Sequence, residues 1–369
     1  MVSQAPTVVP WWMPQIAGGE YDLVKQVLDS NYINEGEFTE RFERAIAERV
    51  GAAYAVAVTS GTAAISLGLA AVGVGAGDEV IVPDLTFIAT ANAASLLGAK
   101  PVLVDIDPRT LNIDPERAEA AITPRTRAIV PVHVSGRGAD MRHILEVARR
   151  HGVAVVEDAA EALTSKQDGR SLGTFGSVGC LSFSPNKTIT TGQGGIALTN
   201  DPDVALRLRQ LKDQGRPTRG TGGDDLHPAV GYNFKLTNLQ AAVGLAQLER
   251  LDERLARQSA IYSTYARELR GVDGIRLPGF DLAAGELPLW TDAVAERRDA
   301  LDRHLRERNM HCRRFWHPLH RQAPYRGSDD RYPNTTRVAP MAIWLPSAFT
   351  LADDDIRRVC GEIRSFLKA

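Results

Sequence analysis

The sequence has 369 residues, enough for two or three domains with substantial cores. Apolar residues make up 44% and charged residues 24%, which excludes a disordered or fibrous chain. The 43 basic and 45 acidic residues nearly cancel, so nothing in the net charge favours binding to nucleic acid or to an anionic membrane. No run approaches the ~18 apolar residues of a membrane span, and the start lacks a signal-peptide pattern, so we expect a cytoplasmic protein.

Residues 50–200 alternate short β-branched runs with longer runs rich in alanine and leucine, which is typical of a parallel sheet covered by helices. Strands are predicted at 53–58, 79–83, 101–106, 128–134, 153–158, 179–183 and 195–200. Helices are predicted at 62–73, 89–98 and 139–152, each ending at a glycine. This part of the chain predicts an α/β domain.

The second part of the chain begins with a long helical pattern over 237–271. Thr237 and Gln240 stand at capping-box spacing at its start, so we expect one helix that leaves the first domain. After a connection rich in glycine and proline, the pattern predicts a strand at 290–295 and helices at 296–309 and 351–368. We expect an N-terminal arm and large domain over 1–245 and a smaller C-terminal domain over 246–369.

The three cysteines are odd in number, widely spaced and placed in segments that read as core or helix. Cys180, Cys312 and Cys360 are therefore expected to be free thiols.

Three motifs follow predicted strands of the first domain. SGTAA at 60–64 opens a helix with small residues, so its N–H groups and the hydroxyls of Ser60 and Thr62 could bind an anion, although an ordinary capped helix would look the same. VVEDAAEA at 155–162 puts carboxylates at a strand end, where they face a ligand or form a cap or salt bridge. LSFSPNKTITTGQGG at 181–195 holds Lys187, either a Schiff-base amine or a surface lysine.

Together the three motifs match the needs of one cofactor. Pyridoxal phosphate requires an amine for its aldehyde, a carboxylate for its pyridinium nitrogen and an anion site for its phosphate. The sequence therefore predicts pyridoxal 5'-phosphate as the cofactor.

These motifs, with NYINEG, FTERFE, VPDLTFIATANA, VDIDP, GYNFKLTNLQAAVGLAQL and RRFWHPLH, span about 30–320. In this order the chain resembles the DegT/DnrJ/EryC1/StrS family of sugar aminotransferases. The resemblance implies fold type I of the pyridoxal-phosphate transferases, the aspartate aminotransferase-like fold, with a large, mostly parallel sheet domain and a smaller α+β C-terminal domain. It also implies a homodimer with shared active sites.

The resemblance also implies roles for single residues. Lys187 would bind the cofactor and move a proton, and Asp158 would hold the ring nitrogen protonated. The other implied cofactor contacts are Ser60, Gly61, Thr62 and Ser182 at the phosphate, Phe87 on the ring face, Glu161 near the ring hydroxyl and Asn233 reaching the neighbouring subunit's phosphate. Core packing for Phe87 and a turn role for Asn233 are the alternatives.

The chain departs from the family pattern at Gln193, where glutamate is common, and at Ser135, where an aromatic residue is frequent. Both changes could reshape the substrate pocket. Lys187 is retained, and this favours transamination over the dehydration performed by relatives that carry histidine at this position.

The run MHCRRFWHPLH at 310–320 contains His311, Cys312, His317 and His320, but its spacing fits no closed zinc site and its arginines repel a cation. We therefore predict no metal. The resemblance implies that Arg314, His317 and His320 contact the sugar or the diphosphate, with a solvated loop as the alternative.

The predicted function is transfer of an amino group from an amino acid, expected to be L-glutamate, to a nucleoside-diphosphate keto-sugar. NYINEG, EDAAEA and NKTITTG are most similar to members that aminate C4 of GDP-4-keto-6-deoxymannose to give perosamine. The alternatives are an aminotransferase for a non-nucleotide ketone, such as a cyclitol or antibiotic precursor, and a non-catalytic regulator that binds pyridoxal phosphate.

Overall fold

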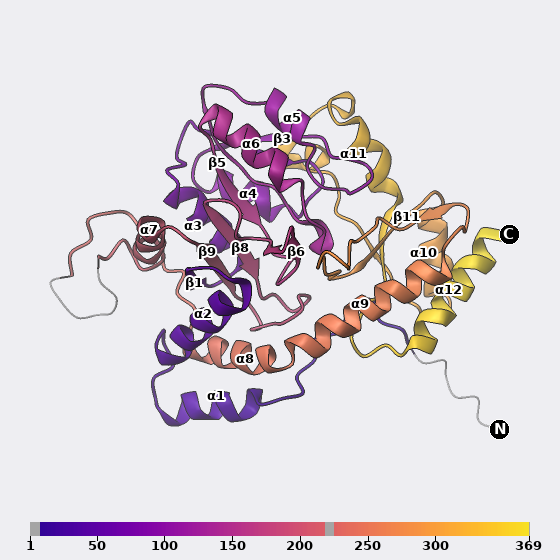
Figure 1. Cartoon of the computed structure of the whole chain (residues 1–369), viewed down its shortest axis with the longest axis horizontal. Coiled ribbons are helices and arrows are strands. Elements are labelled where there is room, and N and C mark those ends of the chain that lie inside the picture. Colours follow the sequence, from indigo (N-terminus) through magenta and orange to yellow (C-terminus); the bar gives the residue numbers. More distant parts are fainter. Residues whose placement is uncertain (1–7, 218–224, 369) are drawn as a thin grey trace.

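The computed structural model describes residues 8–217 and 225–368, which build two sheets with their helices (Figure 1). The larger sheet has seven strands in the order β1-β9-β8-β5-β4-β2-β3. All neighbouring pairs are parallel except those of β9, which runs antiparallel to β1 and to β8. The strands are β1 (Tyr54–Val58), β2 (Glu79–Pro83), β3 (Lys100–Val104), β4 (Thr126–Ile129), β5 (Ala154–Asp158), β8 (Val178–Ser182) and β9 (Gly195–Thr199). The predicted α/β fold with a mostly parallel sheet is confirmed.

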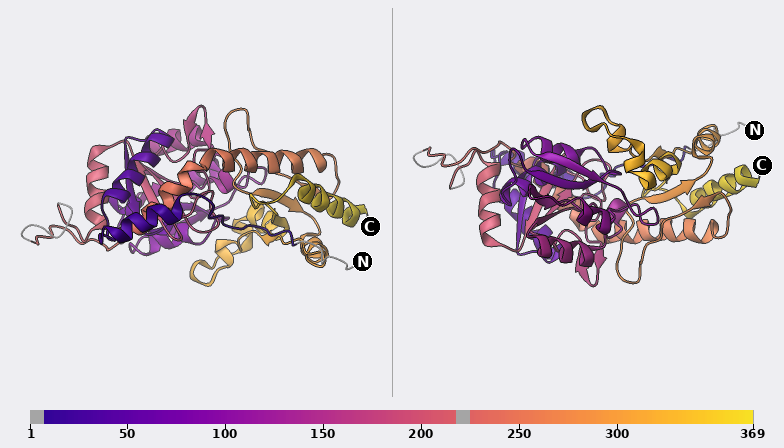
Figure 2. Two further views of the ribbon diagram at one scale, coloured as in Figure 1. Left: turned by 90° about the horizontal axis from the view of Figure 1, so that it is seen from below. Right: turned by 90° about the horizontal axis from the view of Figure 1, so that it is seen from above.

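Helices cover both faces of this sheet, because its strands carry apolar side chains on both sides. One face packs against α3 (Gly61–Ala71), α4 (Ala89–Ser95) and α7 (Pro202–Lys212). The other packs against α2 (Glu37–Val50), α5 (Pro115–Ala120), α6 (Met141–His151) and α8 (Asn238–Glu249), with α1 (Glu20–Asp29) lying against α8. The two turned views in Figure 2 show the helices on either side of the strands.

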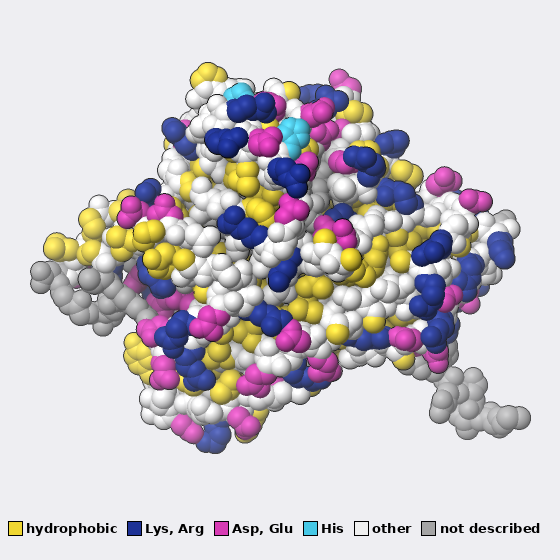
Figure 3. Space-filling model, in the orientation of Figure 1, with side chains coloured by type: hydrophobic (Ala, Val, Ile, Leu, Met, Phe, Trp, Pro, Cys, Tyr) yellow, Lys and Arg dark blue, Asp and Glu magenta, His cyan; other side chains and the backbone are white. Residues whose placement is uncertain are grey.

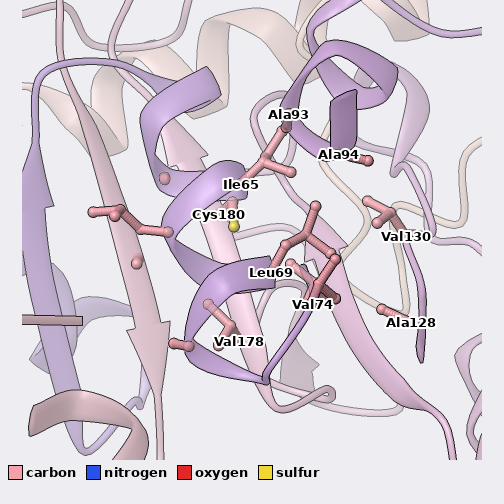
Figure 4. Packing of buried hydrophobic residues seen from close by; sticks show 14 of the residues in the cluster. Ile65, Leu69, Val74, Ala93, Ala94, Ala128, Val130, Val178 and Cys180 are labelled. Atoms are coloured by element: carbon pink, nitrogen blue, oxygen red, sulfur yellow. The ribbon is translucent and has the colours of Figure 1, made fainter. Parts of the chain in front are cut away.

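The core beneath α3 explains how closely that helix approaches the sheet. Ile65 and Leu69 lie among Val178 and Cys180 of β8 and other apolar side chains (Figure 4). A Cβ atom on Gly68 would lie 3.0 Å from a methyl carbon of Val178, so glycine allows this close contact. The N-terminus of α3 is thereby fixed beside the end of β8.

The smaller sheet has four antiparallel strands in the order β10-β11-β13-β12. They are β10 (Ile275–Arg276), β11 (Thr291–Ala295), β12 (Arg313–Arg314) and β13 (Ala342–Leu345). The helices α9 (Leu251–Glu268), α10 (Arg298–Arg306) and α12 (Asp353–Lys368) share a core with this sheet, and α11 (Pro333–Val338) precedes β13. A short hairpin of β6 (Lys166–Gln167) and β7 (Arg170–Ser171) stands apart.

The long helix differs from the sequence expectation, and the N-terminal segment makes contacts that the sequence did not predict. The predicted long helix is divided at Arg250 into α8 and α9, because Arg250 leaves helical geometry at ψ 12°, although the expected capping box of Thr237 and Gln240 is present. The N-terminal segment packs on the smaller sheet, with Val9 bridging to Met310 and Trp11 contacting Trp344. The described part of the N-terminal arm therefore contacts the C-terminal sheet.

The charge distribution on the surface and the state of the cysteines match what the sequence predicts. On the face in Figure 3, basic and acidic side chains are interspersed. Among the described residues, no helix has the length and apolar character needed to cross a membrane. All three cysteines are buried and free, as expected.

Candidate active site

A pocket with a volume of about 310 Å³ opens where β5 and β8 end and α3 begins. This is the edge of an open α/β sheet at which ligands usually bind. Its lining includes the predicted residues Ser60, Gly61, Thr62, Phe87, Asp158, Glu161, Ser182, Lys187 and Gln193, together with Thr86, Ser184, Asn186, Trp290, Arg313, Trp316 and Trp344. The fold thus brings the three sequence motifs together.

The N-terminus of α3 forms an anion cradle at one end of the pocket. The Ser60 side chain accepts a hydrogen bond from Ala63 N at 3.1 Å and caps the helix. The Ser182 and Ser184 hydroxyls lie 3.2 Å apart beside it. A Cβ atom on Gly61 would lie only 2.8 Å from that of Ser182, so glycine keeps this approach open. Backbone N–H groups, hydroxyls and a helix dipole together suit a phosphate.

Asp158 lies at the end of β5 and lines the pocket. Its Oδ2 accepts a hydrogen bond from Thr90 Oγ1 at 2.7 Å, and its Oδ1 accepts one from Ala160 N at 3.2 Å. Burial raises the pKa of Asp158, while the Thr90 hydrogen bond and the charge of Lys187 oppose the shift. A buried carboxylate of this kind is stabilised by a cation in the pocket.

The preceding residue, Glu157, points to the other face of the sheet, because side chains alternate along a strand. Its carboxylate accepts hydrogen bonds from Gly173 N and Gly176 N at 2.8 and 2.7 Å, and pairs with His133 at 3.0 Å. Glu157 is therefore a structural residue, and Asp158 alone of this acidic pair reaches the pocket.

Lys187 lies in the turn between β8 and β9. Its Nζ donates a hydrogen bond to Glu161 Oε1 at 3.2 Å and lies 5.0 Å from the centre of the Trp290 ring. Burial raises the pKa of Glu161, and the Lys187 charge opposes that shift. The amine is thus held between a carboxylate and an aromatic face.

Ser135 connects Glu161 to the C-terminal part of the chain. Its backbone N donates to Glu161 Oε2 at 2.9 Å, and its hydroxyl donates to Asp292 Oδ1 at 2.6 Å. Asp292 also pairs with Arg137 at 2.9 Å, and both side chains are buried. Ser135 has φ 54°, a left-handed conformation that is uncommon outside glycine. Ser135, which departs from the family pattern, therefore helps to hold Glu161, the carboxylate that accepts the hydrogen bond of Lys187.

All five tryptophans of the sequence form one cluster, and three of them, Trp290, Trp316 and Trp344, line the pocket. Trp11, Trp12, Trp290, Trp316 and Trp344 make ring contacts with centroids 4.8–6.5 Å apart. We call this set the tryptophan cluster. Sequence reasoning did not identify it, because its members come from distant segments, but the rarity of tryptophan was an available signal.

Four predicted residues lie outside the pocket lining. Arg314 points to Asp299 and Asp302, at 3.4 and 3.5 Å. His317 and Asn233 are exposed. His320 is fully buried, and both of its ring nitrogens have protein partners. Its Nδ1 lies 2.6 Å from Asp84 Oδ2 and its Nε2 lies 2.9 Å from Asp329 Oδ1.

The chemical groups in the pocket are those that pyridoxal phosphate requires. The cradle at Gly61, whose missing Cβ leaves room beside Ser182, offers donors for the phosphate. Asp158 offers a buried carboxylate for a pyridinium nitrogen, and Lys187 offers an amine in the same pocket. Phe87 and Val132 supply apolar surface for a ring.

Comparison with known proteins defines the class of this chain. It belongs to the DegT/DnrJ/EryC1/StrS aminotransferase family, whose model matches residues 14–364. The protein is therefore an aminotransferase, and its cofactor is pyridoxal phosphate, as predicted.

Individual relatives narrow the comparison. The chain is 40% identical over 363 residues to GDP-perosamine synthase of Caulobacter vibrioides, covering 96% of this chain and 97% of that protein. The structure of DesI determined in the presence of its TDP-sugar product is similar, with a TM-score of 0.89, 32% identity and coverage of 99% and 93%. The structure of 3-amino-5-hydroxybenzoic acid synthase is also similar, with a TM-score of 0.92 and 31% identity. The match covers 99% of this chain and 100% of that chain.

Proposed function

We propose that this aminotransferase moves an amino group from L-glutamate to C4 of GDP-4-keto-6-deoxymannose, giving GDP-perosamine. The observation that carries the proposal is the 40% identity to a GDP-perosamine synthase over nearly the whole of both chains. The pocket supports it, since Lys187, Glu161 and Asp158 line one cavity that is open to a substrate.

We propose that the predicted site residues divide the work as follows. Ser60, Gly61, Thr62 and Ser182 would hold the phosphate, and Phe87 would lie against the ring. Asp158 would accept a hydrogen bond from the ring nitrogen and keep its proton in place. When bound, pyridoxal phosphate supplies an electron-accepting ring that stabilises the negative charge left when the donor carbon loses its proton.

The Lys187 amine moves that proton, because it can alternate between accepting and donating one. Glu161, 3.2 Å away, orients the Nζ atom, and the indole of Trp290 limits the freedom of the amine on its other side. The tryptophan cluster shields the pocket wall from water, which strengthens the electrostatic interactions inside. The second half of the reaction uses the same groups in reverse on the ketone.

We also propose a homodimer that shares its active sites through Asn233. This side chain is exposed and far in sequence from the phosphate motif, so it is free to reach the pocket of a second copy. Leu226 and Val230, 67% and 88% exposed, lie in the same loop, and burial in an interface would remove this apolar surface from water.

The proposed function is tested by incubating the holoenzyme with L-glutamate and GDP-4-keto-6-deoxymannose and identifying the product by mass spectrometry. We expect GDP-perosamine and 2-oxoglutarate in equal amounts, and no product from Lys187→Ala. Amination of a cyclitol or other non-nucleotide ketone, with no reaction of the GDP-sugar, would contradict the proposed acceptor. Absence of any amine transfer across a panel of ketones would favour a regulator.

A further inference from the structure

Two adjacent arginines of β12 have opposite environments. Arg313 pairs across the sheet with Trp344, and Arg314 pairs with Ile343, so their side chains leave opposite faces. Arg314 reaches Asp299 and Asp302 at 3.4 and 3.5 Å. Arg313 lines the pocket, with its guanidinium 4.8 Å from the ring centre of Trp11 and 5.5 Å from that of Trp344.

The Arg313 guanidinium has no ion-pair or hydrogen-bond partner within residues 8–217 and 225–368. Its planar group carries five N–H donors, and stacking on indoles holds its faces while leaving its edges open. Burial lowers the pKa of Arg313 and the charge of Glu161 opposes the shift, but an arginine side chain stays charged in a protein. A fixed cation in a substrate pocket calls for an anion.

We propose that Arg313 binds a carboxylate of the amino-acid donor in a bidentate ion pair. The inference rests on the proposed function, because it assigns one group of the donor to that same pocket. Arg313 and Lys187 line one cavity, and Trp290 contacts both the Lys187 amine and the cluster on which Arg313 stacks. An amino acid entering this cavity can therefore place its amine at Lys187 and its carboxylate at Arg313.

The other anion in the reaction is the diphosphate of the sugar nucleotide. In a hexose the diphosphate is attached at C1, across the ring from the C4 ketone. When C4 lies at Lys187, the diphosphate is therefore directed away from the reacting centre. The donor carboxylate stays close to the amine, because an amino acid carries it on the same carbon or on a short side chain. Proximity to Lys187 thus favours the donor as the ligand of Arg313.

The experiment separates the two half reactions. The holoenzyme is mixed with L-glutamate alone, and loss of the cofactor's visible band is followed in wild type, Arg313→Gln, Arg313→Lys and the matched control Arg314→Gln. We expect kcat/KM for glutamate to fall about 10- to 100-fold in Arg313→Gln, the loss for one hydrogen-bonded charge pair, mainly through KM. Lysine should restore part of the loss, and Arg314→Gln should match wild type.

Two further measurements keep the test independent of folding and of the acceptor. Glutarate, an unreactive dicarboxylate, is titrated into each holoenzyme with tryptophan fluorescence as the readout, and it should bind more weakly to Arg313→Gln alone. The pyridoxamine phosphate form is then mixed with the keto-sugar nucleotide, and its rate should be the same in Arg313→Gln and wild type.

Unchanged glutamate kinetics and glutarate binding in Arg313→Gln would overturn the inference. So would a loss confined to the sugar-nucleotide step, because that result assigns the cation to the diphosphate. If wild type reacts with glutamate but not with the GDP-sugar, the proposed acceptor fails while the glutamate measurements still test Arg313.

Discussion

Asp158 and Glu157 are adjacent carboxylates with separate tasks, and strand geometry alone separates them. Asp158 faces the pocket, with Thr90 Oγ1 2.7 Å from one of its oxygens, whereas Glu157 is enclosed on the far face. The buried Asp158 carboxylate has a raised pKa, so a pyridinium cation beside it would favour its charged form.

This pair gives the first prediction at the residue scale. Asp158→Asn keeps the shape but removes the charge, so we expect turnover to fall about 100- to 1,000-fold, the usual cost of losing one preorganised electrostatic group. Glu157→Gln should lower the free energy of unfolding by about 1–3 kcal/mol, because it leaves buried N–H groups poorly paired, with little change in turnover per folded molecule. Steady-state kinetics and urea denaturation of both variants check this. Equal kinetic losses would contradict the division of tasks.

At the scale of elements, the turn around Ser135 joins the two sheets. Leu289 N donates to Ser135 O at 2.8 Å, and the Ser135 hydroxyl receives a hydrogen bond from Trp344 Nε1 at 3.1 Å while donating to Asp292. Burial raises the pKa of Asp292, and the Arg137 charge opposes the shift. The Ser135 hydroxyl thus forms hydrogen bonds with side chains of both β11 and β13.

Replacing Ser135 should therefore destabilise the protein. Ser135→Ala removes one hydrogen bond from Asp292, which keeps its ion pair with Arg137, and the hydrogen bond from Trp344 Nε1. We expect a loss of about 1–3 kcal/mol in the free energy of unfolding. Ser135→Gly loses the same hydrogen bonds but should be about 1 kcal/mol less destabilised, because glycine adopts φ 54° without strain. Denaturation of the two holoenzymes provides the comparison. An alanine variant as stable as wild type would show that the hydroxyl contributes nothing.

At the scale of the whole molecule, the proposed homodimer with shared active sites predicts complementation between inactive variants. Lys187→Ala and Asn233→Ala are each expected to lose most activity. The first removes the amine from its own pocket, and the second removes the proposed phosphate contact from the pocket of the partner subunit. In a mixed dimer, one site carries both substitutions and the other carries none. Unfolding and refolding the two variants together should therefore restore activity. Recovery no greater than the sum of the separate samples would argue against shared sites.

The cysteines provide a probe of global unfolding. Burial raises the pKa of all three thiols, that of Cys360 to about 12, so almost no thiolate exists at neutral pH. We expect a thiol reagent such as Ellman's reagent to modify none of them in the native holoenzyme at pH 8 and all three after denaturation. Raising the pH toward 12 should increase the reactivity of Cys360. Rapid native labelling at pH 8 would contradict the buried placement.

The sequence was sufficient for the large sheet, because strands buried on both faces appear as apolar runs such as 79–83, which is β2 in the structure. It also led to Lys187 and Asp158, whose motifs follow such strands. It named Arg314 as a substrate contact and not Arg313, which lines the pocket, because the two adjacent residues are both arginine and β12 has only two residues. The tryptophan cluster was also missed, since contacts between residues 11 and 344 depend on tertiary packing.

The tryptophan cluster has a consequence for synthesis of the protein. The phosphate cradle at Ser60 and the lysine at 187 are made early, but the lining of the pocket also includes Trp344. A nascent chain on the ribosome therefore carries an incomplete pocket until residue 344 has been translated. Tight capture of the cofactor should follow the emergence of Trp344, and ribosome-bound chains stalled before residue 344 should bind it weakly.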